Sequence, residues 1–190
     1  MIEINSFISS FHPKPLTFKL DTSDPLKTIS ANKTIFIIGS PIANLLAREA
    51  IETAKGEEEP PDPSLSSQSY LKYVAQKESS ERGVGTIIWD VQNDRLYDSD
   101  RDWEYSMILR ILNDTKDGYL FFIGGPHAPG TLAAAKFLKT NWKLFKGANQ
   151  QIAGLLLRTR RDPYETGKYA DSAQIDKMYG FPKKLTEQYL

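Results

Sequence analysis

Residues 119–138 read YLFFIGGPHAPGTLAAAKFL and carry the clearest strand signal in the chain. The apolar run Tyr119–Ile123 is typical of a buried strand. It ends at Gly124-Gly125-Pro126, and the small side chains of 131–138 would form a helix face able to lie close to a sheet. The segment therefore predicts a strand, a glycine-rich turn and a helix in direct succession.

A second unit of the same kind lies nearer the N-terminus. Thr34–Ile38 is apolar and β-branched and stops at Gly39, which predicts a buried strand of a parallel sheet. Residues 42–55 place apolar side chains near a spacing of 3.6, so we expect an amphipathic helix, with Gly56 as its C-cap. Pro126 follows Pro41 by 85 residues, and 35–43 matches 120–128 at this shift. Internal duplication and a chance match both remain open.

The other elements follow from composition. Strands are expected at 84–91, 106–112 and 152–157, with a turn at 92–95. The turn-rich link 113–118 is short, which favours an antiparallel hairpin between the strands on either side of it. Residues 57–82 are rich in Glu, Pro and Ser, so we expect a mobile loop with a short helix around Tyr70–Gln76.

These elements predict the fold class and the organisation of the chain. We expect a single α/β domain over 1–190, built as a three-layer, Rossmann-like sheet that is mostly parallel and contains one antiparallel hairpin. Residues 1–33 would be an N-terminal arm, because two prolines close together at 13 and 15 argue against a helix. The polar residues 162–190 would be an irregular C-terminal tail.

Composition excludes several classes of function. Lys and Arg number 24, as do Asp and Glu, so the net charge of zero does not favour non-specific binding to nucleic acid or to acidic membranes. The chain has no Cys and 2 His, which rules out disulfides, thiolate metal sites and a His-built zinc site. No apolar run has the length of a membrane span and the start lacks a signal-peptide pattern, so we expect a cytoplasmic protein.

The two glycine-proline turns are the predicted ligand site. In an open parallel sheet, ligands bind at the carboxyl ends of the strands, where helix N-termini offer free N–H groups. Neither turn matches a dinucleotide fingerprint or a P-loop. Arginines near the site would add positive charge. The predicted ligand-binding residues are Gly39, Ser40, Pro41, Asn44, Arg110, Gly124, Gly125, His127, Gly130, Thr131 and Arg158.

Catalysis is the alternative use of the same edge. His127 lies inside the second turn, where an imidazole can act as general acid or base. Asp90 or Glu104 would be its carboxylate partner. Trp103 and Trp142 are able to stack on a base, although aromatic side chains at this abundance mostly fill cores.

The segments 39–44, 104–113 and 124–138 resemble a little-characterised group of prokaryotic Rossmann-like domains of regulatory and defence proteins. That group has Gly-Gly-Pro-x-x-Asn after its first strand and Gly-Thr-x-Ala-Ala before a helix. Ser40 replaces one glycine of the first motif, and Gly130–Ala134 matches the second. The first turn is also similar to that of nucleoside deoxyribosyltransferases, in which a Gly-Pro turn holds substrate. The resemblance implies a sensory or effector domain and no particular cofactor.

The sequence thus predicts binding of a small polar or phosphorylated metabolite, nucleotide-related, by a sensor or accessory domain. One alternative is a hydrolase or glycosyl transferase acting on nucleosides, nucleotides or sugars. The second is a protein-interaction module, or a homo-oligomer, that uses the tail 162–190 as its contact surface. No cofactor and no metal can be named from the sequence.

Overall fold

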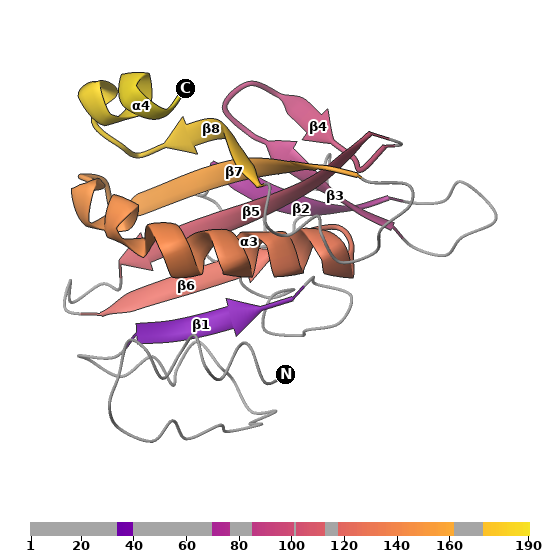
Figure 1. The fold of residues 1–190 in the computed structure, drawn as a ribbon, viewed down its shortest axis with the longest axis horizontal. Coiled ribbons are helices and arrows are strands. Elements are labelled where there is room, and N and C mark those ends of the chain that lie inside the picture. Colours follow the sequence, from indigo (N-terminus) through magenta and orange to yellow (C-terminus); the bar gives the residue numbers. More distant parts are fainter. Residues whose placement is uncertain (1–33, 40–69, 77–84, 101, 113–117, 162–172) are drawn as a thin grey trace, which may run out of the picture.

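Two β-sheets and a long helix form the layers of the protein (Figure 1). The computed structural model describes residues 34–39, 70–76, 85–100, 102–112, 118–161 and 173–190. The five-stranded sheet has the order β1 (Thr34–Ile38), β6 (Tyr119–Gly124), β5 (Trp103–Leu112), β7 (Ile152–Arg160) and β8 (Gln174–Tyr179). The three-stranded sheet has the order β2 (Leu71–Gln76), β3 (Gly85–Asp90) and β4 (Arg95–Tyr97).

The helices follow the strands of the larger sheet. Helix α3 (Ala128–Asn141) starts just after β6 and runs directly into the 3-10 helix η1 (Trp142–Gly147). Helix α4 (Lys183–Tyr189) closes the chain. In the part of the chain that the structure describes, no helix is long and apolar enough to cross a lipid bilayer.

Each face of the larger sheet has its own apolar core. On one face Met107, Leu109 and Ile111 of β5 pack with Leu71 and Tyr73 of the small sheet. On the other face Ile108 packs with residues of α3 and η1, among them Ala134, Leu138, Leu144 and Phe145. The chain thus has a helical layer, a central sheet and a second sheet, in that order (Figure 1).

The Rossmann-like prediction is wrong. Of the strand pairs described, β1 with β6 is parallel, whereas β6 with β5, β5 with β7, and β7 with β8 are antiparallel. An antiparallel sheet, β2-β3-β4, occupies the face where a Rossmann-like fold would have helices. Strands buried on both faces read as continuous apolar runs whether a helix or a second sheet covers them, so the runs alone suggested a parallel sheet.

The secondary structure of two segments differs from the prediction. The helix expected around Tyr70–Gln76 is strand β2, whose Leu71 and Tyr73 are fully buried against the central sheet. The tail predicted to be irregular contains β8 and α4. Strand β8 is an edge strand with one partner and mostly half-exposed side chains, so its sequence is polar.

Several predictions are confirmed. The parallel pairing of β1 and β6 places Thr34 opposite Tyr119 and Ile38 opposite Ile123, which is the same shift of 85 residues found in the sequence. The hairpin of β5 and β6, the strands β3 and β7, and helix α3 are present as expected. The arm 1–33, the helix predicted at 42–55 with Gly56, and most of 57–82 lie outside the described residues.

Candidate functional site

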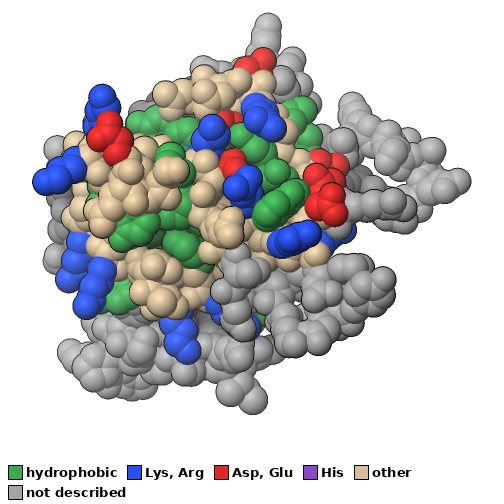
Figure 2. Space-filling view, turned by 45° about the horizontal axis from the view of Figure 1, so that its top comes forward, with side chains coloured by type: hydrophobic (Ala, Val, Ile, Leu, Met, Phe, Trp, Pro, Cys, Tyr) green, Lys and Arg blue, Asp and Glu red, His purple; other side chains and the backbone are tan. Residues whose placement is uncertain are grey.

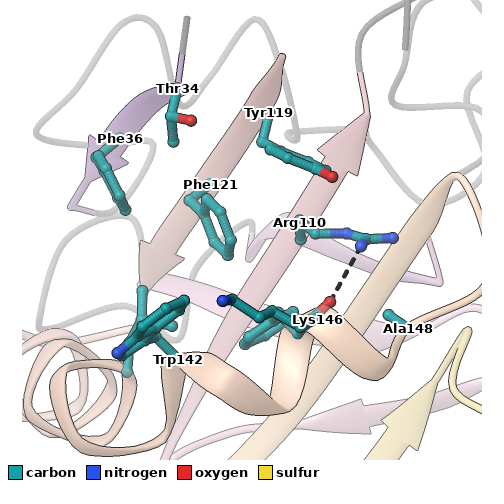
Figure 3. A pocket seen from close by; sticks show the side chains of 10 residues that line it. Thr34, Phe36, Arg110, Tyr119, Phe121, Trp142, Lys146 and Ala148 are labelled. Carbon is teal, nitrogen blue, oxygen red and sulfur yellow. Dashed lines mark hydrogen bonds between the residues drawn. The ribbon is translucent and has the colours of Figure 1, made fainter. Parts of the chain in front are cut away.

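A cavity of about 440 Å³ lies between η1 and the β1–β6 side of the central sheet (Figure 3). This volume is in the range of small-molecule sites, which run from about 300 to 1,000 Å³. The described residues that line it are mostly aromatic or apolar, with two cations: Thr34, Phe36, Arg110, Tyr119, Phe121, Leu138, Trp142, Phe145, Lys146 and Ala148.

The aromatic wall follows from strand alternation. Tyr119 and Phe121 are alternate residues of β6 and point away from the core that holds Leu120 and Phe122. The Phe121 ring stacks on Phe36 of β1, with centroids 5.4 Å apart. It meets Phe145 of η1 edge-on at 5.4 Å. The rings therefore form a continuous apolar surface over two strands and η1.

Arg110 is the buried cation of this pocket, with 6% of its surface exposed. Its Nη1 donates to the Phe145 carbonyl at 3.1 Å and its Nη2 to the Gln150 carbonyl at 2.5 Å. Its guanidinium carbon lies 5.4 Å from the centre of the Tyr119 ring. The Nε atom has no hydrogen-bond partner among the residues that the structure describes. The guanidinium is thus held by carbonyl dipoles and a ring, and Nε is its one nitrogen without a hydrogen bond among the described residues.

Burial lowers the pKa of the Arg110 guanidinium from its ordinary value, and the neighbouring Tyr119 opposes part of this change. Arginine is still charged at neutral pH, since its pKa in proteins remains far above 7. A buried charge without an opposite charge is costly, and an anion beside it would offset that cost.

Lys146 supplies the second cation from η1. Its Nζ lies 4.6 Å from the centre of the Trp142 ring, in a cation–π contact. Lys146 is exposed, unlike Arg110. Figure 3 shows the Lys146 ammonium near the Phe121 ring and the Arg110 guanidinium near the Tyr119 ring. An anion in the cavity can therefore meet the buried guanidinium of Arg110 and the ammonium of the exposed Lys146.

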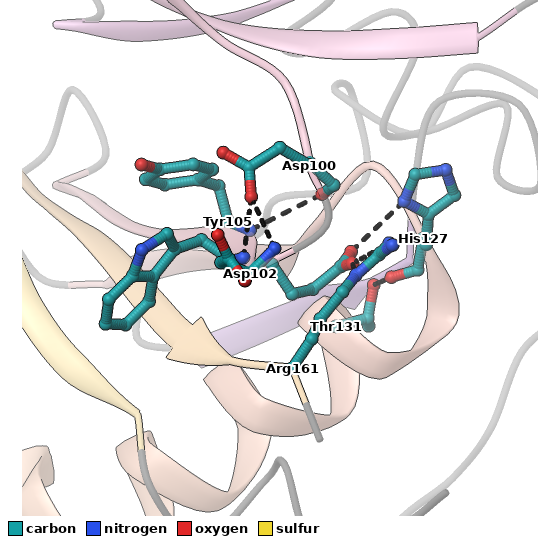
Figure 4. Close-up of polar contacts among 9 residues, drawn as sticks. Asp100, Asp102, Tyr105, His127, Thr131 and Arg161 are labelled. Atoms are coloured by element: carbon teal, nitrogen blue, oxygen red, sulfur yellow. Dashed lines mark hydrogen bonds and ion pairs between the residues drawn. The ribbon is translucent and has the colours of Figure 1, made fainter. Parts of the chain in front are cut away.

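A second polar cluster lies at the opposite end of β5 (Figure 4). Glu104 has 1% of its surface exposed, and its Oε2 accepts from Arg161 Nη2 at 2.7 Å and Nε at 3.2 Å. Its other oxygen, Oε1, lies 3.2 Å from Nδ1 of His127. The His127 side chain is 53% exposed. Glu104 is therefore a buried carboxylate shared between an arginine and the histidine that precedes α3.

Glycine brings α3 close enough for this contact. A Cβ at Gly130 would lie 2.6 Å from the Tyr105 carbonyl oxygen and 3.1 Å from Glu104 Oε1. The Gly125 N–H donates to the Thr131 hydroxyl at 3.0 Å, which joins the turn to the first turn of α3. The start of β5 is pinned as well, because Asp100 accepts the N–H groups of Asp102 and Trp103 at 2.8 and 2.7 Å.

The ends of β1 and β6 meet beside this cluster. The Gly39 N–H donates to the Ile123 carbonyl at 3.0 Å, and a Cβ at Gly124 would lie 2.7 Å from the Gly39 carbonyl oxygen. Gly39 has a φ of 125°, which a residue with a Cβ rarely adopts. Gly39, Gly124, Gly125, His127, Gly130 and Thr131 are thus gathered at one edge, whereas Ser40, Pro41 and Asn44 lie outside the described residues.

Three predicted site residues lie elsewhere. Asp90 is fully buried and accepts from the Tyr179 hydroxyl at 2.6 Å and from Asn93 Nδ2 at 2.7 Å, so it joins β3 to β8. Of the two carboxylates considered for His127, Glu104 is therefore the one in contact. Arg158 lies over the Trp103 ring at 4.9 Å and 3.4 Å from Asp176, and Arg110 lies in the aromatic pocket.

Sequence reasoning did not select Arg161, Lys146, Phe36 or Phe121. The alternation within β6 was a usable signal, since it separates Tyr119 and Phe121 from the core residues Leu120 and Phe122. The role of Arg161 had no such signal. It depends on the register of β7 against β5, in which Arg160 lies opposite Trp103 and the Arg161 N–H donates to the Asp102 carbonyl.

Among the described residues, no group of three or more His, Asp or Glu side chains is placed to hold a metal ion. Comparison of the chain with protein-family models, curated proteins and solved structures gave no match. The geometry of the pocket and of the Glu104 cluster is therefore the basis for function.

Proposed function

We propose that this protein binds a small anionic molecule with a planar ring, of the nucleotide type, in the pocket lined by Arg110. The observation that carries the proposal is the buried Arg110 guanidinium, which lines a cavity of about 440 Å³ and is met by carbonyl groups rather than by a carboxylate among the described residues. Charge-assisted hydrogen bonds to an anion are roughly twice as strong as neutral ones.

The cations and the aromatic rings of the pocket each match one part of such a ligand, its anionic group and its planar ring. Phosphate or carboxylate oxygens match the guanidinium of Arg110 and the ammonium of Lys146. A planar ring matches the aromatic surface of Phe121, Tyr119 and Trp142, since aromatic contacts add about 0.5–1.5 kcal/mol beyond the buried area. Binding and sensing are favoured over turnover in this pocket, because neither cation is a general base at neutral pH.

Titration calorimetry on the full chain tests the proposal with AMP, adenosine and inorganic phosphate as probes. We expect AMP to bind more tightly than either adenosine or phosphate, because it alone engages both the rings and the cations. Arg110→Met should weaken AMP binding at least tenfold, since a hydrogen bond to a charged group contributes about 1.5–3 kcal/mol. Lys146→Met should weaken it less, because Lys146 is exposed.

Two control variants also replace an arginine or a lysine by methionine, but at positions that do not line the cavity. Arg158→Met removes an arginine that also stacks on a ring but whose contacts are Trp103 and Asp176. Lys143→Met removes an exposed lysine of η1 that does not line the cavity. Both should leave AMP binding unchanged. Equal losses in Arg158→Met and Arg110→Met, or equal binding of AMP and adenosine, would overturn the proposal.

A further inference from the structure

We propose that His127 is a phosphoryl acceptor, whose Nε2 attacks small N-phosphoryl donors. This inference concerns the Glu104 cluster and is independent of ligand binding at Arg110, since the two sites lie at opposite ends of β5. The geometry behind it is a half-exposed imidazole whose other nitrogen is engaged by a buried carboxylate.

The contact with Glu104 selects which nitrogen is the nucleophile. A carboxylate accepts hydrogen bonds, so Oε1 at 3.2 Å favours the tautomer with the proton on Nδ1. The lone pair is then on Nε2, the ring nitrogen of His127 that makes no dashed contact in Figure 4. Because the side chain is 53% exposed, a small reagent can reach that nitrogen without any change in the fold.

The surroundings favour a negatively charged group at this place. Arg161 binds Glu104 through two hydrogen bonds and offsets its charge, while its own side chain remains 36% exposed. His127 is the N-cap of α3, a helix of 14 residues with no acidic residue in its first turn. The partial positive charge of that helix end stabilises anions nearby. An arginine on the carboxylate that engages Nδ1 and a helix N-terminus that begins at His127 are therefore the positive charges nearest this side chain in the cluster.

The chemical step is balanced without a redox partner. Nε2 forms a bond to phosphorus as the phosphorus–nitrogen bond of the donor, protonated on its nitrogen, breaks. The leaving nitrogen takes that electron pair and departs as a neutral amine. The imidazole becomes positively charged while Nδ1 keeps its proton. The hydrogen bond from Nδ1 to Glu104 stabilises that charge as it develops, which makes Glu104 a positioning residue rather than one that touches the donor.

Phosphoramidate is the probe, and the chain provides its own internal comparison because His12 is the other histidine. Intact-mass and peptide analysis should show one phosphoryl group on His127, lost in acid and retained in alkali. We expect His127 to react at least tenfold faster than His12 in the same molecule. His127→Gln should abolish the fast reaction, and His12→Gln should leave it unchanged.

Two measurements test the role of Glu104: the phosphorylation rate of a variant and the position of the imidazole proton. Glu104→Gln should slow phosphorylation of His127 at least tenfold, with a melting curve to show that the variant is folded. Nitrogen NMR of the unmodified protein should find the proton of His127 on Nδ1, which decides the matter even if Glu104→Gln does not fold. Equal rates at His127 and His12, a proton on Nε2 instead, or an unchanged rate in folded Glu104→Gln would each overturn the proposal.

Discussion

The two ends of β5 present charged side chains of opposite sign to the same helical layer. Glu104 and Arg110 are six residues apart, about 20 Å along an extended strand, and both face α3 or η1. Both are almost completely buried, with 1% and 6% of their surfaces exposed. Glu104 is met by the opposite charge of Arg161. Arg110 is met by the carbonyl groups of Phe145 and Gln150.

The two ends therefore differ in whether the buried charge has a counter-ion within the protein. At the Glu104 end the two charges offset each other, and what remains accessible is the imidazole of His127. At the Arg110 end the carbonyl dipoles satisfy donors but leave the net positive charge uncompensated among the described residues, beside a cavity. Removing one partner of a buried ion pair destabilises the fold, whereas a buried positive charge without a counter-ion favours an external anion. Four substitutions test this distinction.

The largest effect is expected for Glu104→Ala. Removing one member of a buried ion pair typically costs 3–5 kcal/mol. The lower end applies here, about 3 kcal/mol in the free energy of unfolding, because Arg161 is partly exposed and can be hydrated. Urea denaturation followed by circular dichroism measures the change.

The control for Glu104 is an exposed ion pair of the same kind. Glu187 lies 3.6 Å from Lys183 on α4, with 65% of its side chain exposed. Glu187→Ala should change the free energy of unfolding by less than about 0.5 kcal/mol. Similar losses for the two variants would mean that burial does not make the Glu104 pair more important for stability than an exposed one.

Gly130→Ala should be next, with a loss of about 2 kcal/mol in unfolding free energy, since overpacking usually costs 1–3 kcal/mol. The added Cβ would lie 2.6 Å from a backbone oxygen of β5, so helix α3 must move away from Glu104. Gly147→Ala is the control, because its added Cβ meets the flexible end of Leu185 at 3.0 Å. A larger loss in Gly147→Ala than in Gly130→Ala would contradict the close approach as the cause.

Tyr179→Phe examines a third buried charged side chain, Asp90, whose described partners are neutral. The variant loses the hydrogen bond of 2.6 Å to Asp90. We expect a loss of about 1.5 kcal/mol in unfolding free energy at pH 7. Chemical denaturation measures it, and Tyr189→Phe, on an exposed tyrosine of α4, is the control with no expected change. An unchanged stability would show that Asp90 is held by Asn93 alone.

The same variant has a pH signature. Burial raises the pKa of Tyr179, and the hydrogen bond to Asp90 raises it further. A raised pKa means that the folded state holds this proton when the unfolded state has lost it, so stability falls as pH rises above about 10. Burial likewise raises the pKa values of Tyr73, Tyr97 and Tyr105. Tyr179→Phe should make the alkaline decline shallower by about 1.4 kcal/mol per pH unit, and an unchanged slope would contradict the assignment.

Local elements were largely predictable from the sequence, but their assembly was not. The strand Tyr119–Ile123 and the helix after it could be predicted because glycine and proline mark their limits. The pairing of β5 with β7 joins residues about 50 apart, and no local signal encodes it. Strand β3 of the small sheet was predicted, but the sheet itself was missed because the six residues of β2 are too few to reveal a period.

The residues of the candidate site were likewise partly predictable from the sequence, whereas their contacts were not. The glycine turns and His127 could be identified because a strand that ends in Gly-Gly-Pro places them at a sheet edge. Arg110 was selected as a charged residue within an apolar strand, but its position in an aromatic pocket required η1 to fold over the sheet. Glu104 and His127 are 23 residues apart, and their contact depends on how close Gly130 lets α3 approach.

The smallest effect on stability is expected for Arg110→Met, and it most directly tests the contrast with Glu104. Methionine preserves the apolar stem of the side chain, and removing an uncompensated buried charge relieves its desolvation cost. Replacing buried charges by apolar residues is often neutral or stabilising. The lost bonds to two carbonyl groups oppose this gain, so we expect a net change within about 1 kcal/mol in denaturation experiments without ligand. At about 100 times the wild-type dissociation constant AMP should stabilise the wild type by about 2.7 kcal/mol and the variant, which binds at least tenfold more weakly, by no more than about 1.4 kcal/mol. A loss as large as that of Glu104→Ala would instead make Arg110 a structural residue like Glu104, and the two ends of β5 would then differ only in the sign of their charge.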